Sequence, residues 1–434
     1  MKSIDRRKFI KDISKYVSGA FIGGYVFDSM LFRPQQAHAS IMASVYVAKN
    51  GTPAENVAKV IDMRFGGIEN IIGSEDIVVI NPNGQWTNQG GSNCACCMGL
   101  IDLILNRPSG FSGEIIFTEC TQFSSTGYWT ATGNGLLRNG PYNFNDMIAY
   151  YHSQGHNNVN GVRLWRNTDD SSNWPVVTGP HEGQGWVREG CAYQCPPPSN
   201  RWYSITYPCI RSPYSNKIID LKNGIYDNGY DNQPSLKFIK MPNLNNHGGN
   251  GQMDYAGITS ALKSFLGITE IGGPPYLTLH DGYSHTAHEV GQAIGGWMNN
   301  CRKPDFFLTT AEWVGWGDRT SSLATQAKTV GFGEDPVTLD YYMSKYVLWP
   351  THPESQHFNP DYNPESNNSR LTMDGCQSLG FGTTNESEIA AIVYDYNSPS
   401  TFRFDIDRKI KAFREGGADL QEVLDLISQY NSGE

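Results

Sequence analysis

Strand-like and helical patterns of apolar residues alternate along the first part of the chain. Residues with strand-like patterns lie at 44–49, 77–80 and 113–120. Residues with helical spacing lie at 54–72 and 98–105. Because the run at 77–80 is continuously β-branched, it fits a strand that is covered on both faces. This succession predicts an α/β fold, with a mainly parallel sheet and crossover helices.

The same patterns return in the second half of the sequence. Helices are predicted at residues 143–153, 254–266, 337–346 and 420–427. Strands are predicted at residues 159–165, 235–242, 276–282 and 306–310. Between residues 167 and 213 no apolar repeat is sustained, and Trp, Pro, Ser and Cys are frequent. We expect a single α/β domain over residues 40–434, with an irregular aromatic- and Cys-rich insertion at 167–213 that lies across the carboxyl edge of the sheet.

The N-terminus has the features of a twin-arginine signal peptide. Arg6 and Arg7 precede a weakly apolar stretch, and Ala37-His38-Ala39 is a small-residue cleavage site. We therefore expect a signal peptide over residues 1–39, secretion by the twin-arginine export machinery and a periplasmic location. The alternative is an amphipathic N-terminal helix of the fold. No segment is long and apolar enough to predict a stable membrane span.

The charge of the chain restricts its partners. Residues 1–39 carry seven of the 33 basic and three of the 43 acidic residues, so 26 basic and 40 acidic residues remain after cleavage, a formal charge of −14. An acidic surface argues against nucleic acid or anionic membrane as a partner. The twin-arginine route carries folded proteins, often because a cofactor is inserted before export, so a cofactor is expected although the sequence does not identify it.

Polar residues follow several of the predicted strands. Because the carboxyl ends of parallel strands meet at one edge of a sheet, their side chains can converge on a small-molecule ligand. The candidate ligand-binding residues are Asn83, His247 and His280, and the candidate catalytic residues are Lys263, Asp281 and Asp340. A plain Asx turn is the alternative for Asn83, and a solvated helix face for Lys263.

Two groups of residues are candidate metal ligands. Cys94, Cys96 and Cys97 lie at the predicted start of a helix, whose dipole stabilises thiolates that can bind a metal or an iron–sulfur cluster. In an oxidising compartment the alternative is disulfide formation, for which a second group of cysteines also qualifies: Cys191, Cys195 and Cys209.

His285 and His288 form the second group, because residues three apart share one face of a helix and can reach one metal. Helix capping or ordinary surface positions are the alternative. Asp335, directly before Pro336, is predicted to cap the helix that follows, whereas Asp340 inside that helix has less structural reason to be there.

Three blocks of the sequence resemble the family catalogued as "domain of unknown function 362": Asp76–Asn83, Gly257–Gly267 and Asp335–Asp340. They occur in the family's order, and the similarity spans Val45 to about Leu348. Many members carry iron–sulfur ferredoxin modules or export signals, which implies a redox or cofactor-linked role. This chain departs from the family at Asn81, where lysine is usual, and at Ser264, where asparagine is common. It also lacks a ferredoxin-type C-x-x-C-x-x-C run.

Two classes of function remain open from the sequence. The first is a cofactor- or metal-dependent enzyme, in keeping with a redox role, that acts on a small molecule after export. The second is a non-catalytic periplasmic protein that binds a small molecule. Nucleophile-elbow, phosphate-loop and dinucleotide-binding motifs are absent from the sequence, so hydrolase, kinase and dehydrogenase functions have no motif support.

Overall fold

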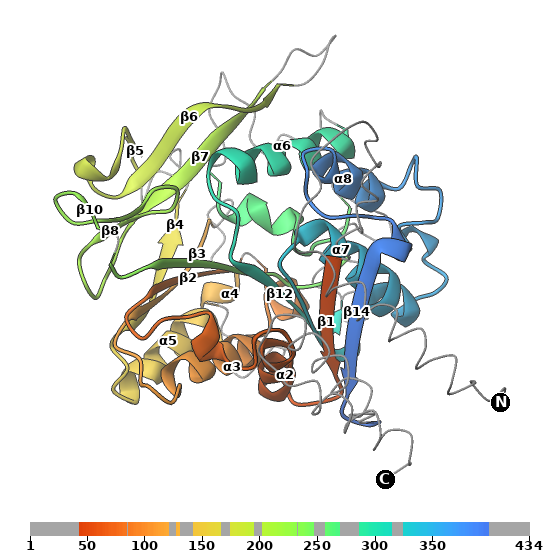
Figure 1. The fold of residues 1–434 in the computed structure, drawn as a ribbon, viewed down its shortest axis with the longest axis horizontal. Coiled ribbons are helices and arrows are strands. Elements are labelled where there is room, and N and C mark those ends of the chain that lie inside the picture. Colours follow the sequence, from red (N-terminus) through yellow and green to blue (C-terminus); the bar gives the residue numbers. More distant parts are fainter. Residues whose placement is uncertain are drawn as a thin grey trace, which may run out of the picture. The chain divides into compact units, whose positions relative to one another are not determined.

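Two β-sheets organise the protein, which we describe from a computed structural model (Figure 1). The structure describes residues 43–84, 86–120, 127–130, 142–165, 174–194, 202–231, 233–246, 257–269, 286–314 and 324–398. The larger sheet has eight strands in the order β14-β1-β13-β12-β11-β2-β3-β4. They are β1 (Ala43–Lys49), β2 (Ile77–Pro82), β3 (Glu114–Cys120), β4 (Val159–Leu164), β11 (Leu236–Met241), β12 (Phe306–Val314), β13 (Thr325–Gly333) and β14 (Ile389–Asp395).

The large sheet is mostly parallel, as the sequence predicts. Strands β12, β11, β2, β3 and β4 are parallel to one another, and β14 is parallel to β1. Strand β13 is antiparallel to both β1 and β12. The α/β class is therefore shown, and the five adjacent parallel strands bring their carboxyl ends to one edge.

Helices cover both faces of this sheet. They are α2 (Pro53–Phe65), α3 (Cys94–Leu105), α4 (Gly127–Thr130), α5 (Phe144–Ser153), α6 (Ala287–Asn300), α7 (Pro336–Met343) and α8 (Asn368–Gln377). Figure 1 shows α2, α3 and α5 on one side of the sheet, and α6 and α8 on the other. Successive residues of β2 point to opposite faces, so Val78 packs with the first group and Val79 with the second. The continuous apolar run of β2 is thus explained by burial on both faces.

Local signals explain where several helices begin and end. The Thr52 side chain accepts a hydrogen bond from the Glu55 N–H at the start of α2, and the Glu55 carboxylate accepts one from the Thr52 N–H. Gly66 ends this helix in the left-handed region, at φ 75°. Asp335 caps α7 by accepting hydrogen bonds from the Val337 and Thr338 N–H groups, which confirms the capping prediction.

The segment predicted to be irregular at 167–213 instead contributes strands to a second, six-stranded sheet in the order β10-β9-β8-β7-β6-β5. Its strands are β5 (Val176–Val177), β6 (Gly185–Gln194), β7 (Trp202–Arg211), β8 (Ile218–Asp220), β9 (Gly224–Tyr226) and β10 (Tyr230–Asp231). The expectation of irregular structure is wrong for the described part of the segment, and the sheet extends beyond residue 213.

The second sheet packs over a face of the large sheet and does not simply lie across its carboxyl edge. Trp297 of α6 donates from Nε1 to the Thr206 carbonyl oxygen at 2.9 Å. Ser212, which follows β7, donates to the Glu114 carboxylate at the amino end of β3. Val79 and Ile116 belong to the same apolar core as this sheet. The aromatic residues of the segment therefore serve as core.

One further expectation is wrong. The helix predicted at residues 254–266 is, in its described part, a loop that ends in a short 3-10 helix at Lys263–Gly267. Strands β13 and β14 were not predicted. The strand predicted at 276–282 and the helix predicted at 420–427 lie outside the described residues. In the part of the chain that the structure describes, no helix has the length and apolar character to cross a membrane.

Candidate functional site at the carboxyl edge of the large sheet

A fully buried lysine lies near the carboxyl ends of the parallel strands. Lys240 of β11 is paired in register with Asn81 of β2, and its Nζ atom is 2.5 Å from Asn81 Oδ1. Nζ also donates to the Ser264 carbonyl oxygen at 3.0 Å and lies 4.3 Å from the centre of the Phe265 ring. Burial holds the pKa of Lys240 well below its usual 10.5. Cation–π contact and two hydrogen bonds partly replace the water that this ammonium group loses.

Glu119 is the acidic counterpart of Lys240. It lies near the end of β3, is 3% exposed and accepts a hydrogen bond from the Gly84 N–H. Burial raises its pKa well above 4.5, while the Gly84 N–H and the charge of Lys240 act in the opposite direction. Lys240 and Glu119 therefore form an electrostatically coupled buried pair, in which each group stabilises the charged form of the other.

The Glu119 carboxylate is packed closely against two glycines. A Cβ atom on Gly84 would lie 2.5 Å from Glu119 Oε2 and 2.7 Å from Trp129 Nε1, and one on Gly267 would lie 2.9 Å from Glu119 Oε1. Trp129 is 1% exposed, and its Nε1–H has no hydrogen-bond acceptor among the described residues. An unmatched donor thus lies close to a buried carboxylate at the sheet's edge.

Amide and hydroxyl groups join the ends of β2, β11 and β12. Asn83 Oδ1 accepts from the Asn243 N–H at 2.8 Å, and the Thr310 hydroxyl donates to Asn243 Oδ1 at 3.3 Å. The Asn93 N–H donates to Thr310 Oγ1 at 3.2 Å. Asn83 therefore contacts the chain well beyond its own turn. Its side chain links two strand ends that are far apart in sequence.

The segment Gly257–Gly267 docks on this edge through Asp340. The two carboxylate oxygens of Asp340 accept hydrogen bonds from the Ala261 N–H at 2.8 Å and the Leu262 N–H at 2.9 Å. Burial raises the pKa of Asp340 to about 7, and hydrogen bonds from Ser260 and from these two N–H groups oppose the shift. Asp340, which seemed to lack a structural role, holds this segment against α7.

Asn245 lies beyond the end of β11 with an unsatisfied side chain. Its backbone pairs with that of Thr259, through hydrogen bonds of 3.0 Å and 2.9 Å. Its side-chain amide is 1% exposed, and within the described part of the chain neither Oδ1 nor Nδ2 has a partner. A buried amide in this state can accept up to two hydrogen bonds and donate two. It is suited to a ligand that offers a donor and an acceptor side by side.

Three members of the predicted site lie in the described part of the chain. Lys263 is 6% exposed, so the alternative of a solvated helix face is wrong, and its Nζ atom lies 3.5 Å from the Gly257 carbonyl oxygen. Asn83 contacts Asn243 beyond β11, and Asp340 contacts the segment that contains Lys263. His247, His280 and Asp281 lie outside the described residues.

The three cysteines lie at the start of α3, as the sequence predicts, but they are buried. Cys94, Cys96 and Cys97 are packed in the apolar core and have no exposed surface. Burial raises the pKa of Cys94 to about 12 and those of Cys96 and Cys97 well above 9.0. The loss of hydration therefore outweighs the helix dipole for these free thiols, and the three side chains do not come together as a metal-binding group.

The structure also bears on the two histidines that were candidate metal ligands and on the cysteines that were candidates for disulfide formation. Helix α6 begins after Thr286, so of the two histidines only His288 lies on it, and His285 lies outside the described residues. Cys209 is a buried free thiol. The side chains of Cys191 and Cys195 are outside the described part. Among the described residues, no three His, Cys, Asp or Glu side chains come together to hold a metal ion.

Sequence reasoning missed Lys240 and Glu119. Both lie in strands that were predicted, and each is the charged residue closest to the carboxyl end of a largely apolar run. A charged residue in a strand that is covered on both faces must be buried, which was the available signal.

Comparison with protein-family models gives no match for this chain, and comparison with curated proteins gives none either.

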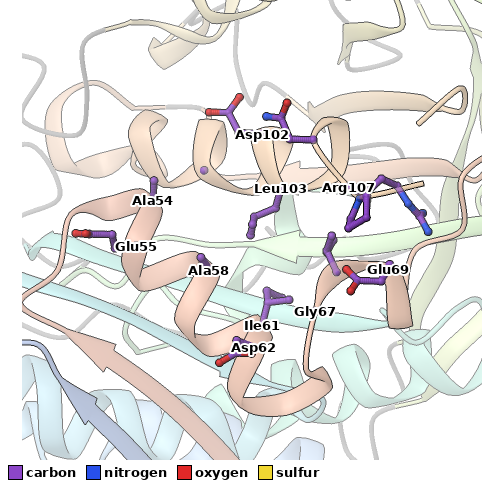
Figure 2. Close-up of a pocket in the computed structure, with 14 residues that line it drawn as sticks. Ala54, Glu55, Ala58, Ile61, Asp62, Gly67, Glu69, Asp102, Leu103 and Arg107 are labelled. Atoms are coloured by element: carbon purple, nitrogen blue, oxygen red, sulfur yellow. The ribbon is translucent and has the colours of Figure 1, made fainter. Parts of the chain in front are cut away.

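A separate surface groove lies between α2 and α3 (Figure 2). Its volume is about 540 Å³. Ala54, Ala58 and Leu103 supply apolar surface, while Glu69 and Arg107 lie toward one end. Because none of the residues of the carboxyl-edge site lines this groove, it does not extend that site.

Proposed function

We propose that this protein is an exported enzyme, related to the family catalogued as "domain of unknown function 362", that acts on a small polar molecule at the carboxyl edge of its large sheet. The observation that carries the proposal is the buried pair of Lys240 and Glu119. Paired groups whose pKa values are displaced by burial are typical of acid–base sites, although they also occur as structural pairs.

In this proposal Glu119 is the group that exchanges a proton with the substrate. Its carboxylate packs against Gly84, whose N–H donates to it, and lies near the unmatched Nε1–H of Trp129. Lys240 is a positioning residue, because its Nζ atom is fully enclosed and acts through its charge on Glu119. Asn81 donates from Nδ2 to the Thr118 carbonyl oxygen at 2.6 Å, which turns its Oδ1 toward Lys240.

The arrangement also bears on the departure from the resembled family at Asn81. The cation that is usual at that position is absent from β2, but the neighbouring strand β11 places the Lys240 ammonium group 2.5 Å from Asn81 Oδ1. A positive charge is thus retained at this point of the edge. The proposal includes a cofactor or metal, for which Cys94, Cys96 and Cys97 are unsuitable because of their burial.

A second candidate function is a non-catalytic periplasmic protein that binds a small molecule. It is favoured by Asn245, whose unsatisfied amide suits recognition and supplies no acid or base. In this alternative Lys240 and Glu119 are a structural pair.

The two functions are separated by analysing protein that is purified after native export. Metal content is measured by mass spectrometry, and bound chromophores by absorption spectroscopy. A metal or chromophore in stoichiometric amount supports the enzyme. Its absence, together with saturable binding of a small molecule that is not consumed, overturns the enzyme and supports the binding protein.

A further inference from the structure

A pocket of about 580 Å³ lies along β4, the edge strand of the large sheet, and is bordered by the second sheet. Arg163 and Trp165 line it from the end of β4, Asn145 from α5, and Gln184 and Arg211 from the second sheet and its preceding loop. A volume of this size matches a small-molecule ligand. Trp129, whose Nε1 atom lies near Glu119, also lines the pocket, whereas Lys240 and Glu119 do not.

Arg163 is the residue that gives the pocket its chemistry. Its Nε and Nη2 atoms are buried and have no hydrogen-bond partner among the described residues. These two nitrogens form one edge of the guanidinium group, whose two parallel N–H bonds match the two oxygens of a carboxylate or phosphate. Burial lowers the pKa of Arg163, which forms no ion pair with a carboxylate of the described residues.

Trp165 fixes the orientation of this group. The Arg163 guanidinium carbon lies 4.1 Å from the centre of the Trp165 ring, so the cation is held over the indole face. The indole of Trp186 donates to the Trp165 carbonyl oxygen at 2.7 Å, which ties this part of the chain to the second sheet. The guanidinium edge is therefore preorganised, and a ligand does not have to order a flexible side chain.

The charge of the pocket is opposite to that of the protein. Of the described residues that line it, two are arginines and none is acidic, whereas the chain as a whole has a formal charge of −10. Arg211 is held by hydrogen bonds from Nη1 to the carbonyl oxygen and Oδ1 of Asn216, and has no carboxylate partner among the described residues. An isolated positive pocket on an acidic protein attracts small anions.

We propose that this pocket binds a small organic anion, a carboxylate or a phosphate ester, through the Nε and Nη2 edge of Arg163. The amides of Asn145 and Gln184 supply neutral hydrogen-bonding groups at the rim for hydroxyl groups of the same ligand. This site is additional to the proposed acid–base site, and its occupation does not depend on Lys240 or Glu119.

Isothermal titration calorimetry at low ionic strength tests the proposal on the purified full chain. The probes are gluconate and glucose 6-phosphate, with glucose as the neutral control. At least one anion should bind saturably at one site per chain, and the comparison of the two anions distinguishes carboxylate from phosphate recognition. Binding of neither anion, or equally tight binding of glucose, overturns the proposal.

Variants locate the binding. Arg163→Gln should weaken binding of the anion by about tenfold or more, because two charge-assisted hydrogen bonds are lost. Arg64→Gln removes an arginine that pairs with Glu334 at 2.8 Å, outside the pocket, and should leave the affinity unchanged. If Arg163→Gln does not fold, Arg163→Lys keeps the charge but not the two-nitrogen edge, and should still bind more weakly than the wild type. Unchanged affinity in the folded Arg163 variant contradicts the inference.

Discussion

The Nζ atom of Lys240 lies 2.5 Å from Oδ1 of Asn81, across the register pair that joins β11 to β2. Both side chains are fully buried, so water does not compete for this hydrogen bond. A buried ammonium group is tolerated when a counter-charge and hydrogen bonds compensate it, and Glu119 supplies the counter-charge. The three side chains therefore act as one unit, and changes to them should not be additive.

A double-mutant cycle tests this coupling. Lys240→Met should cost about 3–5 kcal/mol in the free energy of unfolding, because Glu119 is left without its counter-charge. The double variant Lys240→Met, Glu119→Gln should be more stable than the sum of the single effects by at least about 1 kcal/mol. Urea denaturation at pH 7 measures both quantities.

A surface pair provides the control for this cycle. Lys49 and Asp395 are 3.2 Å apart, with side chains that are 42% and 24% exposed. The corresponding changes, Lys49→Met and Asp395→Asn, should show a coupling of about 0.5 kcal/mol or less. If the coupling between Lys240 and Glu119 is no larger than that of the surface pair, the buried unit does not exist.

Gly84 packs so closely against Glu119 that it leaves no room for a methyl group. Gly84→Ala places a Cβ atom 2.5 Å from Glu119 Oε2 and 2.7 Å from Trp129 Nε1. We expect a loss of about 1–3 kcal/mol in unfolding free energy, because these buried groups must move apart. Gly229→Ala is the matched control, since its Cβ would meet no atom within 4 Å. Thermal and urea denaturation of the two variants should differ, and equal stabilities would exclude the close packing of Glu119 against Gly84.

Predictions that rest on residues close together in the sequence are confirmed by the structure. The strand at Ile77–Pro82 follows from a continuous β-branched run, and the cap at Asp335 follows from its place before Pro336. Strands β6 and β7 were missed because register shifts near Glu189 and Cys191 disturb the alternation on which strand prediction depends. Lys328, at φ 44° within β13, disturbs that strand in a similar way.

The site residues that were missed depend on contacts far apart in the sequence. Lys240 reads locally as a polar residue in a strand, and only the packing of Asn81, Ser264 and Phe265 around it shows that it is buried. The role of Asp340 likewise depends on N–H groups that lie almost 80 residues earlier in the chain. Periodicity reports which face is buried, but not which polar groups meet there.

The burial of the α3 cysteines predicts low reactivity. Cys94, Cys96 and Cys97 are fully buried, and their raised pKa values leave almost no thiolate at pH 8. Iodoacetamide should therefore not label the peptide that carries them in the native protein, whereas labelling should be complete after denaturation in urea. Peptide mass spectrometry reads out both states. Rapid labelling of this peptide in native protein would restore these thiols as candidates for metal binding.

The export proposal rests on Arg6 and Arg7. The twin-arginine pathway reads the arginine pair, so Arg6→Lys combined with Arg7→Lys should retain the precursor in the cytoplasm. Arg33→Lys, which makes the same chemical change beyond the apolar stretch, is the control and should be exported. Immunoblots of cell fractions show the distribution, and N-terminal sequencing should find the mature chain beginning at Ser40. Normal export of the double variant would rule out this route.

Asp340 predicts a pH-dependent contribution to stability with a definite sign. Burial raises its pKa from 3.8 to about 7, so between these values the folded protein binds a proton that the unfolded chain has released. The contribution of Asp340 is therefore fully present below about pH 4 and is lost as the pH rises through 7, by on the order of 4 kcal/mol. Asp340→Asn cannot titrate and keeps one acceptor for two N–H groups. Its free energy of unfolding should therefore be lower than that of the wild type at pH 4.5, and the difference should shrink toward pH 8. Other buried carboxyl groups, such as Glu114, affect both proteins alike and cancel in the difference. Urea denaturation at several pH values measures this margin, and a margin that does not change with pH would show that the carboxyl group of Asp340 titrates normally.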